Sequence, residues 1–177
     1  MDASTIDAAR RGNREAQAGL LRHLQDPWYR LCLSLLRDGD LARDATQETA
    51  LRFLRELPNF RQQSQLQTWS FGIAINVARE MRRSAGRAEM IDEHRMAGRQ
   101  QLARTPFDSA AGAEEREVLR AHLAALPERQ REAIVLRYFE EMSIDEAAAA
   151  MDCAAGTVKA TIHQALRSLR NKLKQLT

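Results

Sequence analysis

Residues 126–173 read LPERQREAIVLRYFEEMSIDEAAAAMDCAAGTVKATIHQALRSLRNKL. Pro127 stands at an early helical position, and apolar residues then recur at three-to-four spacing, which predicts a first helix. Ser143 and Glu146 have the spacing of a capping box, so a short alanine-rich helix begins there. The segment that ends at Gly156 breaks this helix, and a longer basic helix follows. The order of helices predicts a helix-turn-helix, a motif that places its second helix in the DNA major groove.

The long helix from about Gly156 to Leu173 has two unlike faces. At 100° per residue its core stripe holds Val158, Ile162, Ala165, Leu166, Leu169 and Leu173. The opposite face and its flanks hold Thr157, Lys159, Ala160, His163, Gln164, Arg167, Arg170 and Asn171. An ordinary solvated helix would also show such a face, but Lys159 and Gln164 favour DNA because both pair with purine edges. We expect the N-terminal residues to read bases and Arg167 and Arg170 to hold the phosphate backbone.

The composition is typical of a helical globular protein. Of 177 residues, 29% are charged, 44% are hydrophobic and only 5% are aromatic, and no run of alternating β-branched residues predicts a sheet. The predicted fold class is therefore all-α. No apolar stretch approaches the roughly 20 residues that span a bilayer, and residues 1–7 lack the blocks of a signal peptide. We expect a cytoplasmic protein without membrane insertion.

The sequence predicts neither a metal site nor an enzyme. Cys32 and Cys153 lie in apolar helical surroundings that favour packed, reduced thiols. The histidines have no ligand spacing; they are His23, His94, His122 and His163. No phosphate-binding glycine loop or activated nucleophile is visible. We expect no cofactor, no small-molecule substrate and no catalytic residues.

Charge is distributed unevenly along the chain. The formal net charge is only +3. Arginine and lysine concentrate in residues 79–104 and 159–174, whereas residues 40–56 are richer in acid. Clustered cations favour DNA, and the acidic stretch is free to meet another partner.

The chain divides into a first helical domain over residues 1–83, a linker over 84–113 and a second domain over 114–177. The linker is predicted to be flexible because glycines and Pro106 interrupt it and no apolar stripe runs through it. In the first domain, Asp26-Pro27 predicts a bend or break, Asp40 predicts an N-cap, and Pro58 predicts a helix end. Helices are expected over residues 4–11, 14–36, 40–56 and from about 67 to 83.

Two segments of the first domain resemble the extracytoplasmic-function (ECF) class of bacterial sigma factors. Residues 40–48 read DLARDATQE, similar to the acidic helix by which that family binds the clamp of core RNA polymerase. Asp44, Gln47 and Glu48 share one helical face, which suits a docking surface. Residues 57–61 read LPNFR and residues 68–79 read TWSFGIAINVAR, similar to the family's promoter-melting segment.

The resemblance implies recognition of a minus-10 element, with a base of the non-template strand flipped into a pocket formed by the loop before Trp69. Amide, hydroxyl and guanidinium groups suit an unstacked base and its strand. The residues expected there are Phe60, Arg61, Gln62, Gln63, Ser64, Gln65, Asn76, Arg79, Arg82 and Arg83. Trp69 itself is expected to pack in the core.

The second domain resembles the family's minus-35-reading domain, through LPERQR at residues 126–131 and GTVK at residues 156–159. The residues implied there are Gly156, Thr157, Lys159, Ala160, His163, Gln164 and Arg167. The implied partners are promoter DNA, core RNA polymerase through the β′ clamp and the β flap, and an anti-sigma factor. Residues 70–72 depart from the usual Leu-aromatic-Arg, and Gly72 is explained either by packing or by a close approach of DNA.

The implied function is a dissociable initiation subunit that directs RNA polymerase to promoters carrying minus-10 and minus-35 elements. The alternative is a free-standing helix-turn-helix regulator, which explains the second domain equally well. Such a regulator does not explain the acidic face at Asp44 beside the Phe60-to-Asn76 segment. It also predicts palindromic DNA binding without polymerase.

Overall fold

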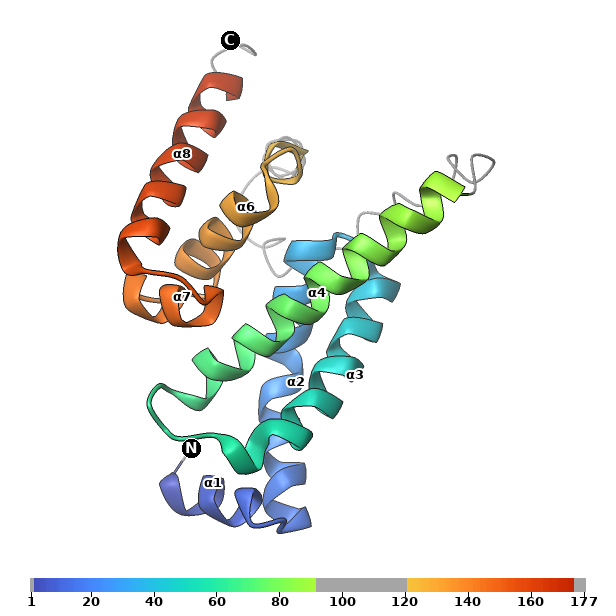
Figure 1. The fold of residues 1–177 in the computed structure, drawn as a ribbon, viewed down its shortest axis with the longest axis vertical. Helices are drawn as coiled ribbons and strands as arrows, with labels where there is room; N and C mark the ends of the chain where they lie inside the picture. The colour runs from blue at the N-terminus through green and yellow to red at the C-terminus, as the bar shows by residue number, and fades with distance from the viewer. Residues whose placement is uncertain (1, 92–120, 174–177) are drawn as a thin grey trace.

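The structure is a computed structural model that describes residues 2–91 and 121–173. In these ranges every regular element is helical, which confirms the all-α prediction. Figure 1 shows the first domain as a bundle of three long helices crossed at one end by a short one. Its elements are α1 (Ala3–Arg10), α2 (Arg14–Leu36), α3 (Gly39–Glu56), the 3-10 turn η1 (Leu57–Asn59) and α4 (Leu66–Ile91).

The second domain contains the predicted helix-turn-helix. Its elements are α6 (Glu128–Ile134), the π-helical turn η2 (Val135–Phe139), α7 (Ile144–Met151) and α8 (Ala155–Leu173). Pro127 is the N-cap of α6, just before the helix and not inside it as predicted. The capping box of α7 is present as predicted, with Ser143 and Glu146 each bonding the other's backbone N–H.

A chain of aromatic rings holds the first domain together. Trp28 of α2 is completely buried, and its indole N–H donates to Ser70 Oγ of α4 at 2.9 Å. The rings of Trp28 and Phe53 lie 5.1 Å apart, and Phe53 continues the contact to Trp69 at 5.6 Å. Trp69 then packs on Phe60 at 4.8 Å. Trp69 is therefore a packing residue, as expected.

Two local predictions for the first domain are wrong. Helix α2 runs without a break through Pro27, because Leu24, Trp28 and Leu31 anchor both sides of the proline in the core. Burial of these side chains outweighs the cost of about 3 kcal/mol for a proline within a helix. The N-cap of α3 is Asp38 and not Asp40, since the Asp38 carboxylate accepts the backbone N–H groups of residues 40 and 41 at 2.9 Å.

Helix α4 is longer than predicted. It continues past Arg83 to Ile91, so residues 84–91 of the predicted linker are helical. Helix α3 ends at Glu56, as predicted, and the chain passes into η1, which contains Pro58. Residues 92–113 of the predicted linker lie outside the described residues.

The buried stripe of α8 is narrower than the apolar stripe predicted from the sequence. Val158, Ile162, Ala165 and Leu169 of α8 are buried, whereas Leu166 is 39% exposed, so its assignment to the core stripe is wrong. Helices α6 and α7 cover one side of α8, and Leu166 lies at the edge of that covered side. Cys32 is a buried free thiol whose pKa is raised to about 12 by burial, and Cys153 is free and half-buried.

The two domains pack against each other. Helix α4 contacts α7 (Figure 1). The turn η2 also contacts α2. Helices α4 and α7 approach closely at Gly72, where an added Cβ would lie 3.3 Å from the backbone oxygen of Ala150. Packing against the second domain therefore accounts for this glycine.

Replacing Ser143 with alanine is expected to destabilise the second domain by about 1 kcal/mol, because the backbone N–H of Glu146 loses the Ser143 Oγ to which it donates at 3.2 Å. Thermal unfolding followed by circular dichroism measures this effect. Glu146→Gln keeps a side chain that can accept from the Ser143 backbone N–H and is expected to cost less. Equal losses in the two variants would contradict this account of the cap.

Candidate nucleic-acid and polymerase interfaces

Helix α8 presents its predicted DNA-reading residues on one open face. The side chains or backbone are exposed at Gly156, Thr157, Lys159, Ala160, His163, Gln164, Arg167 and Arg170. The sequence folds this way because the buried residues on the opposite side, Val158 and Ile162 among them, pack on α6 and α7. The first turn of α8 combines hydrogen-bonding and cationic groups with an exposed methyl group, a set that suits base edges in a major groove.

The loop before α4 forms a pocket with a volume of about 480 Å³. Its walls combine amide, hydroxyl and imidazole groups with apolar side chains from α1 and α2. The lining residues are Ile6, His23, Leu24, Phe60, Gln62, Ser64, Gln65, Leu66 and Gln67. The pocket is large enough for a nucleobase and offers both stacking surface and hydrogen-bond partners.

The pocket differs from the sequence-based expectation in three ways. Phe60 is only 4% exposed and packs on Trp69, so it is part of the pocket's apolar base and not an open stacking platform. Ile6 and His23 contribute from helices far away in the sequence, and no sequence signal pointed to them. Arg61 and Gln63 are exposed but do not line the pocket.

Helix α1 contacts the pocket loop directly. Gln62 adopts the left-handed conformation at φ 54°, and its side-chain amide donates to Asp7 Oδ1 at 3.0 Å. Arg10 donates to the Pro58 carbonyl at 3.5 Å and to Asp7 at 3.1 Å. These bonds attach the chain to helix α1 at two places before α4, at Pro58 and at Gln62.

Asn76 and Arg83 share a second, smaller hollow of about 220 Å³ between α3 and α4. An ion pair lies beside them: Arg52 of α3 donates to both carboxylate oxygens of Glu80 of α4, at 2.9 and 2.7 Å. This bidentate bond lowers the pKa of Glu80. It fixes the position of α4 along α3, and with it the row of polar residues on α4.

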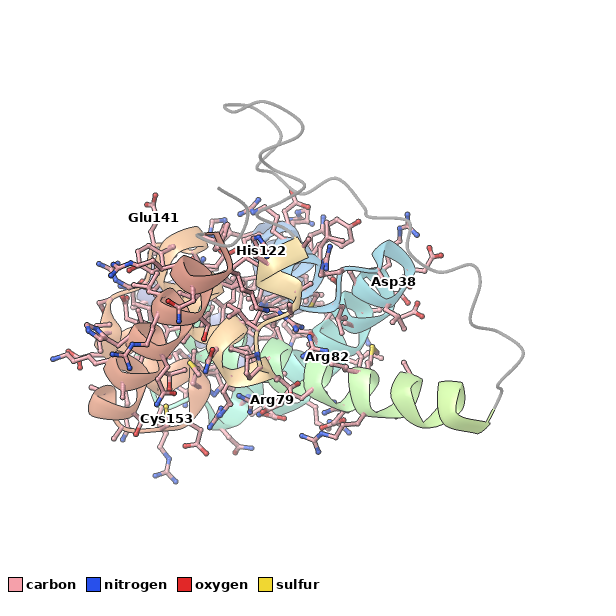
Figure 2. The ribbon with its side chains drawn as sticks, turned by 90° about the horizontal axis from the view of Figure 1, so that it is seen from above. Asp38, Arg79, Arg82, His122, Glu141 and Cys153 are labelled. Atoms are coloured by element: carbon pink, nitrogen blue, oxygen red, sulfur yellow. The ribbon has the colours of Figure 1, made fainter. Side chains whose placement is uncertain are left out.

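Arg79 and Arg82, both expected at minus-10 DNA, contact the second domain in this structure (Figure 2). Arg79 donates from Nε and Nη2 to the two carboxylate oxygens of Glu132, each at 2.7 Å. Arg82 donates to Glu128 at 3.1 Å and also to the carbonyl of Leu35. Hydrogen bonding to Glu132 raises the pKa of Arg79, although burial acts in the opposite direction.

Arg131 joins the same interface from α6. Its guanidinium donates to the carbonyls of Leu123, Ala124 and Leu126 in its own domain, and to Leu35 at the end of α2. Burial and the nearby cations lower its pKa to about 10. The C-terminal carbonyls of α2 therefore attract two arginines, Arg82 and Arg131, as expected for the negative end of a helix dipole.

The predicted polymerase face lies on α3. Asp44 and Gln47 are exposed, whereas Glu48 is half-buried and accepts from Arg52 at 2.6 Å. Sequence reasoning missed Leu51, which continues the same face one turn later and is 63% exposed. The sequence did carry a signal for Leu51: it is an apolar residue at the helical spacing that places it on the same face as Gln47 and Glu48. Leu51 adds exposed apolar area beside the two acids and the amide of this face.

Within the described ranges, no group of three or more histidine, cysteine, aspartate or glutamate side chains could hold a metal ion. No helix in those ranges has the length and apolar character needed to cross a bilayer.

Two family models match the chain, one over each domain. They are Sigma-70 region 2, over residues 20–88, and Sigma-70, region 4, over residues 116–169. Together they account for more than half of the sequence and follow each other in the order expected of a sigma factor. This chain therefore belongs to the sigma-70 family, in its ECF class.

Relatives along the whole chain agree with this class. The chain is 27% identical to the ECF RNA polymerase sigma factor SigW of Bacillus subtilis, which it matches over 97% of its own length and 96% of that protein's. It is 28% identical to the ECF RNA polymerase sigma-E factor of Escherichia coli K12, over 99% and 95% of the two chains. A free-standing regulator is not favoured, because it leaves the region 2 match unexplained.

Solved structures match both domains together. The sigma factor RpoE from Bartonella quintana, in complex with the anti-sigma factor NepR, is 26% identical with a TM-score of 0.73, over 89% of this chain and 96% of that one. CnrH in complex with the cytosolic domain of CnrY is 22% identical with a TM-score of 0.71, over 98% and 97%, and supports the fold.

Proposed function

We propose that this sigma factor binds core RNA polymerase and directs initiation at promoters by reading two DNA elements with its two domains. Residues 1–83 would bind polymerase and the minus-10 strand, residues 114–177 would read the minus-35 duplex, and residues 84–113 would connect them. One observation carries the proposal: the same chain has a base-sized pocket at the loop before α4 and an open polar face on α8. Each domain can bind its own element weakly, because polymerase holds the two domains at a fixed spacing and the two contacts together give specificity.

The polymerase surface is proposed on α3, at Asp44, Gln47, Glu48 and Leu51. Asp44 and Gln47 are exposed, while the bond from Arg52 holds Glu48 in place. Leu51 supplies apolar area at the edge of these polar groups. We place the β′ clamp at this surface and the β flap at the second domain.

The minus-10 site is proposed at the pocket and along α4. Gln62, Ser64 and Gln65 line the pocket and would bond the edge of a flipped base. The remaining residues would hold the strand on either side: Arg61, Gln63, Asn76, Arg79, Arg82 and Arg83. Phe60 contributes only the apolar base of the pocket, because it is buried.

The minus-35 site is proposed on the exposed face of α8. Replacing Gln164 with alanine is expected to relax the preference for one base pair by about 1–3 kcal/mol, because a paired purine edge loses its partner. Replacing Arg167 is expected to weaken all sequences equally and to reduce the salt dependence by about one phosphate contact. Binding of variant duplexes across a salt series by the polymerase-bound sigma factor distinguishes the two effects. A uniform loss from Gln164→Ala would contradict its role in base reading.

Regulation by an anti-sigma factor is part of the proposal. The similar RpoE of Bartonella quintana is bound by the anti-sigma factor NepR, and this chain exposes Leu51 and Tyr138, at 63% and 53%, as apolar contact points. The chain would carry no catalytic residue of its own, since polymerase performs the chemistry. Its place of action would be the cytoplasm, where polymerase and promoters are found.

The purified chain mixed with bacterial core RNA polymerase is expected to co-elute with it and to initiate transcription at particular sites of a genomic DNA library. Deleting residues 114–177 is expected to abolish recognition of the upstream element. Sequence-specific DNA binding with no association with polymerase would instead place the protein among free-standing regulators.

A further inference from the structure

Two arginines proposed to bind the minus-10 strand already have anionic ligands in the free chain. Arg79 forms a bidentate bond with Glu132, and Arg82 bonds Glu128. Both carboxylates come from the first two turns of α6, in the other domain. Helix α6 therefore presents its acids to the same guanidinium groups that would meet DNA.

A carboxylate and a phosphate are alternative ligands for one guanidinium. Each presents two oxygens that match the two parallel N–H groups of arginine. Arg79 already uses Nε and Nη2 on Glu132, and its Nη1 donates to Asn76 Oδ1 at 3.1 Å. A phosphate would have to displace Glu132 to gain the same bidentate contact.

Burial makes the two states exclusive. The side chain of Arg79 is only 17% exposed and that of Glu132 is 2% exposed. About two helical turns before Arg79, α4 and α7 approach so closely at Gly72 and Ala150 that an added Cβ would lie 3.3 Å from a backbone oxygen. A DNA strand cannot reach Arg79 along α4 while the second domain stays in this position.

We propose that Glu128 and Glu132 form an internal latch that occupies the DNA-binding arginines Arg79 and Arg82 and keeps the free chain from binding the minus-10 strand. The inference rests on the proposed minus-10 role of these arginines. Polymerase, by binding the two domains at separate places, would open the latch and deliver both readers to the promoter together.

The latch is suited to opening because a buried ion pair contributes little net stability. The attraction between Arg79 and Glu132 is offset by the cost of removing both charges from water. A strand that supplies phosphates to Arg79 replaces one ligand with another. The two ion pairs can therefore occupy Arg79 and Arg82 in the free chain without preventing assembly of the complex.

The test compares Glu132→Gln and Glu128→Gln with the unaltered full-length chain, without polymerase. Two readouts are used: the affinity for a short mixed-sequence single-stranded DNA oligonucleotide, and the interdomain distance from fluorescence energy transfer between labels on α1 and α8. If the closed state hides the arginines in most molecules, Glu132→Gln is expected to bind DNA about tenfold more tightly and to lengthen the distance. Glu128→Gln, whose parent side chain is 37% exposed, is expected to act in the same direction but less.

Asp145→Asn is the matched control for charge. Asp145 is exposed on α7, and its replacement changes the net charge by the same amount without touching the latch. Gly72→Val opens the interface by a different route, because its side chain would meet the Ala150 backbone while both acids stay in place. Gly72→Val is expected to bind DNA more tightly, and Asp145→Asn is expected to stay within about twofold of the parent, as for a single exposed charge.

An unchanged interdomain distance in Glu132→Gln and Gly72→Val, or a gain in affinity no larger than that of Asp145→Asn, would overturn the latch. Thermal unfolding confirms that each variant is folded; if Glu132→Gln is not, Glu128→Gln and Gly72→Val decide the result. Initiation with core polymerase is measured in parallel. Failure of the unaltered chain to initiate would count against the proposed function, whereas the distances in the free chain report on the latch alone.

Discussion

Replacement of Trp28 with alanine is expected to lower the free energy of unfolding by about 3–5 kcal/mol, which is a large part of the 5–15 kcal/mol typical of a folded domain. Trp28 is completely buried and contacts the ring of Phe53 at 5.1 Å. Its removal leaves a cavity where α2, α3 and α4 meet. Urea unfolding followed by circular dichroism measures the loss.

Trp28→Phe is the informative control. Phenylalanine keeps most of the buried ring but loses the indole N–H that donates to Ser70 at 2.9 Å. Ser70 Oγ still donates to the Gln67 carbonyl, so the serine keeps one partner. A smaller loss of about 1–3 kcal/mol is expected. Similar losses for the two variants would show that the hydrogen bond, not the packing, dominates at this position.

Asp44→Arg is expected to weaken binding to core RNA polymerase by at least about 100-fold, because charge reversal within a docking surface costs several kcal/mol. Asp44 is exposed on α3 and lies on the same face as Gln47 and Leu51. The fold should be unaffected, since the side chain packs against nothing in the core. Titration of labelled sigma factor with core polymerase gives the dissociation constant.

Asp26→Arg is the matched control for Asp44→Arg. Asp26 is exposed on α2, outside the proposed polymerase face, and its replacement makes the same change in net charge. It is expected to leave polymerase affinity within a few-fold of the parent, as for a charge outside the interface. If Asp26→Arg were as harmful as Asp44→Arg, the effect would be one of overall charge and the α3 surface would be wrong. Glu48 is a poorer position for this test because its reversal also breaks the bond to Arg52.

Local signals predicted much of the fold correctly. The capping box at Ser143 and Glu146 and the break after Met151 are interactions between residues close in sequence, so they can be found without knowing the tertiary structure. The open polar face of α8 follows from helical periodicity in the same way. Leu166 is an exception, because the width of the covered stripe depends on where α6 and α7 lie.

Predictions failed where packing outweighed local preference. Pro27 has the local character of a break, yet burial on both sides keeps α2 continuous. The pocket before α4 needs Ile6 and His23, which reach it only because α1 and α2 pack beside the loop. Neither outcome depends on the residues next to it in sequence.

The sequence by itself determined the helical class, the helix-turn-helix and the two sets of residues with the chemistry to bind DNA, since these follow from periodicity, capping and residue type. Only the tertiary structure decided which of those residues are free. It placed Arg79 and Arg82 against Glu132 and Glu128, nearly fifty or more positions away in the chain. These long-range ion pairs join α4 to α6 where the two domains pack against each other, and no pattern within either segment encodes their pairing.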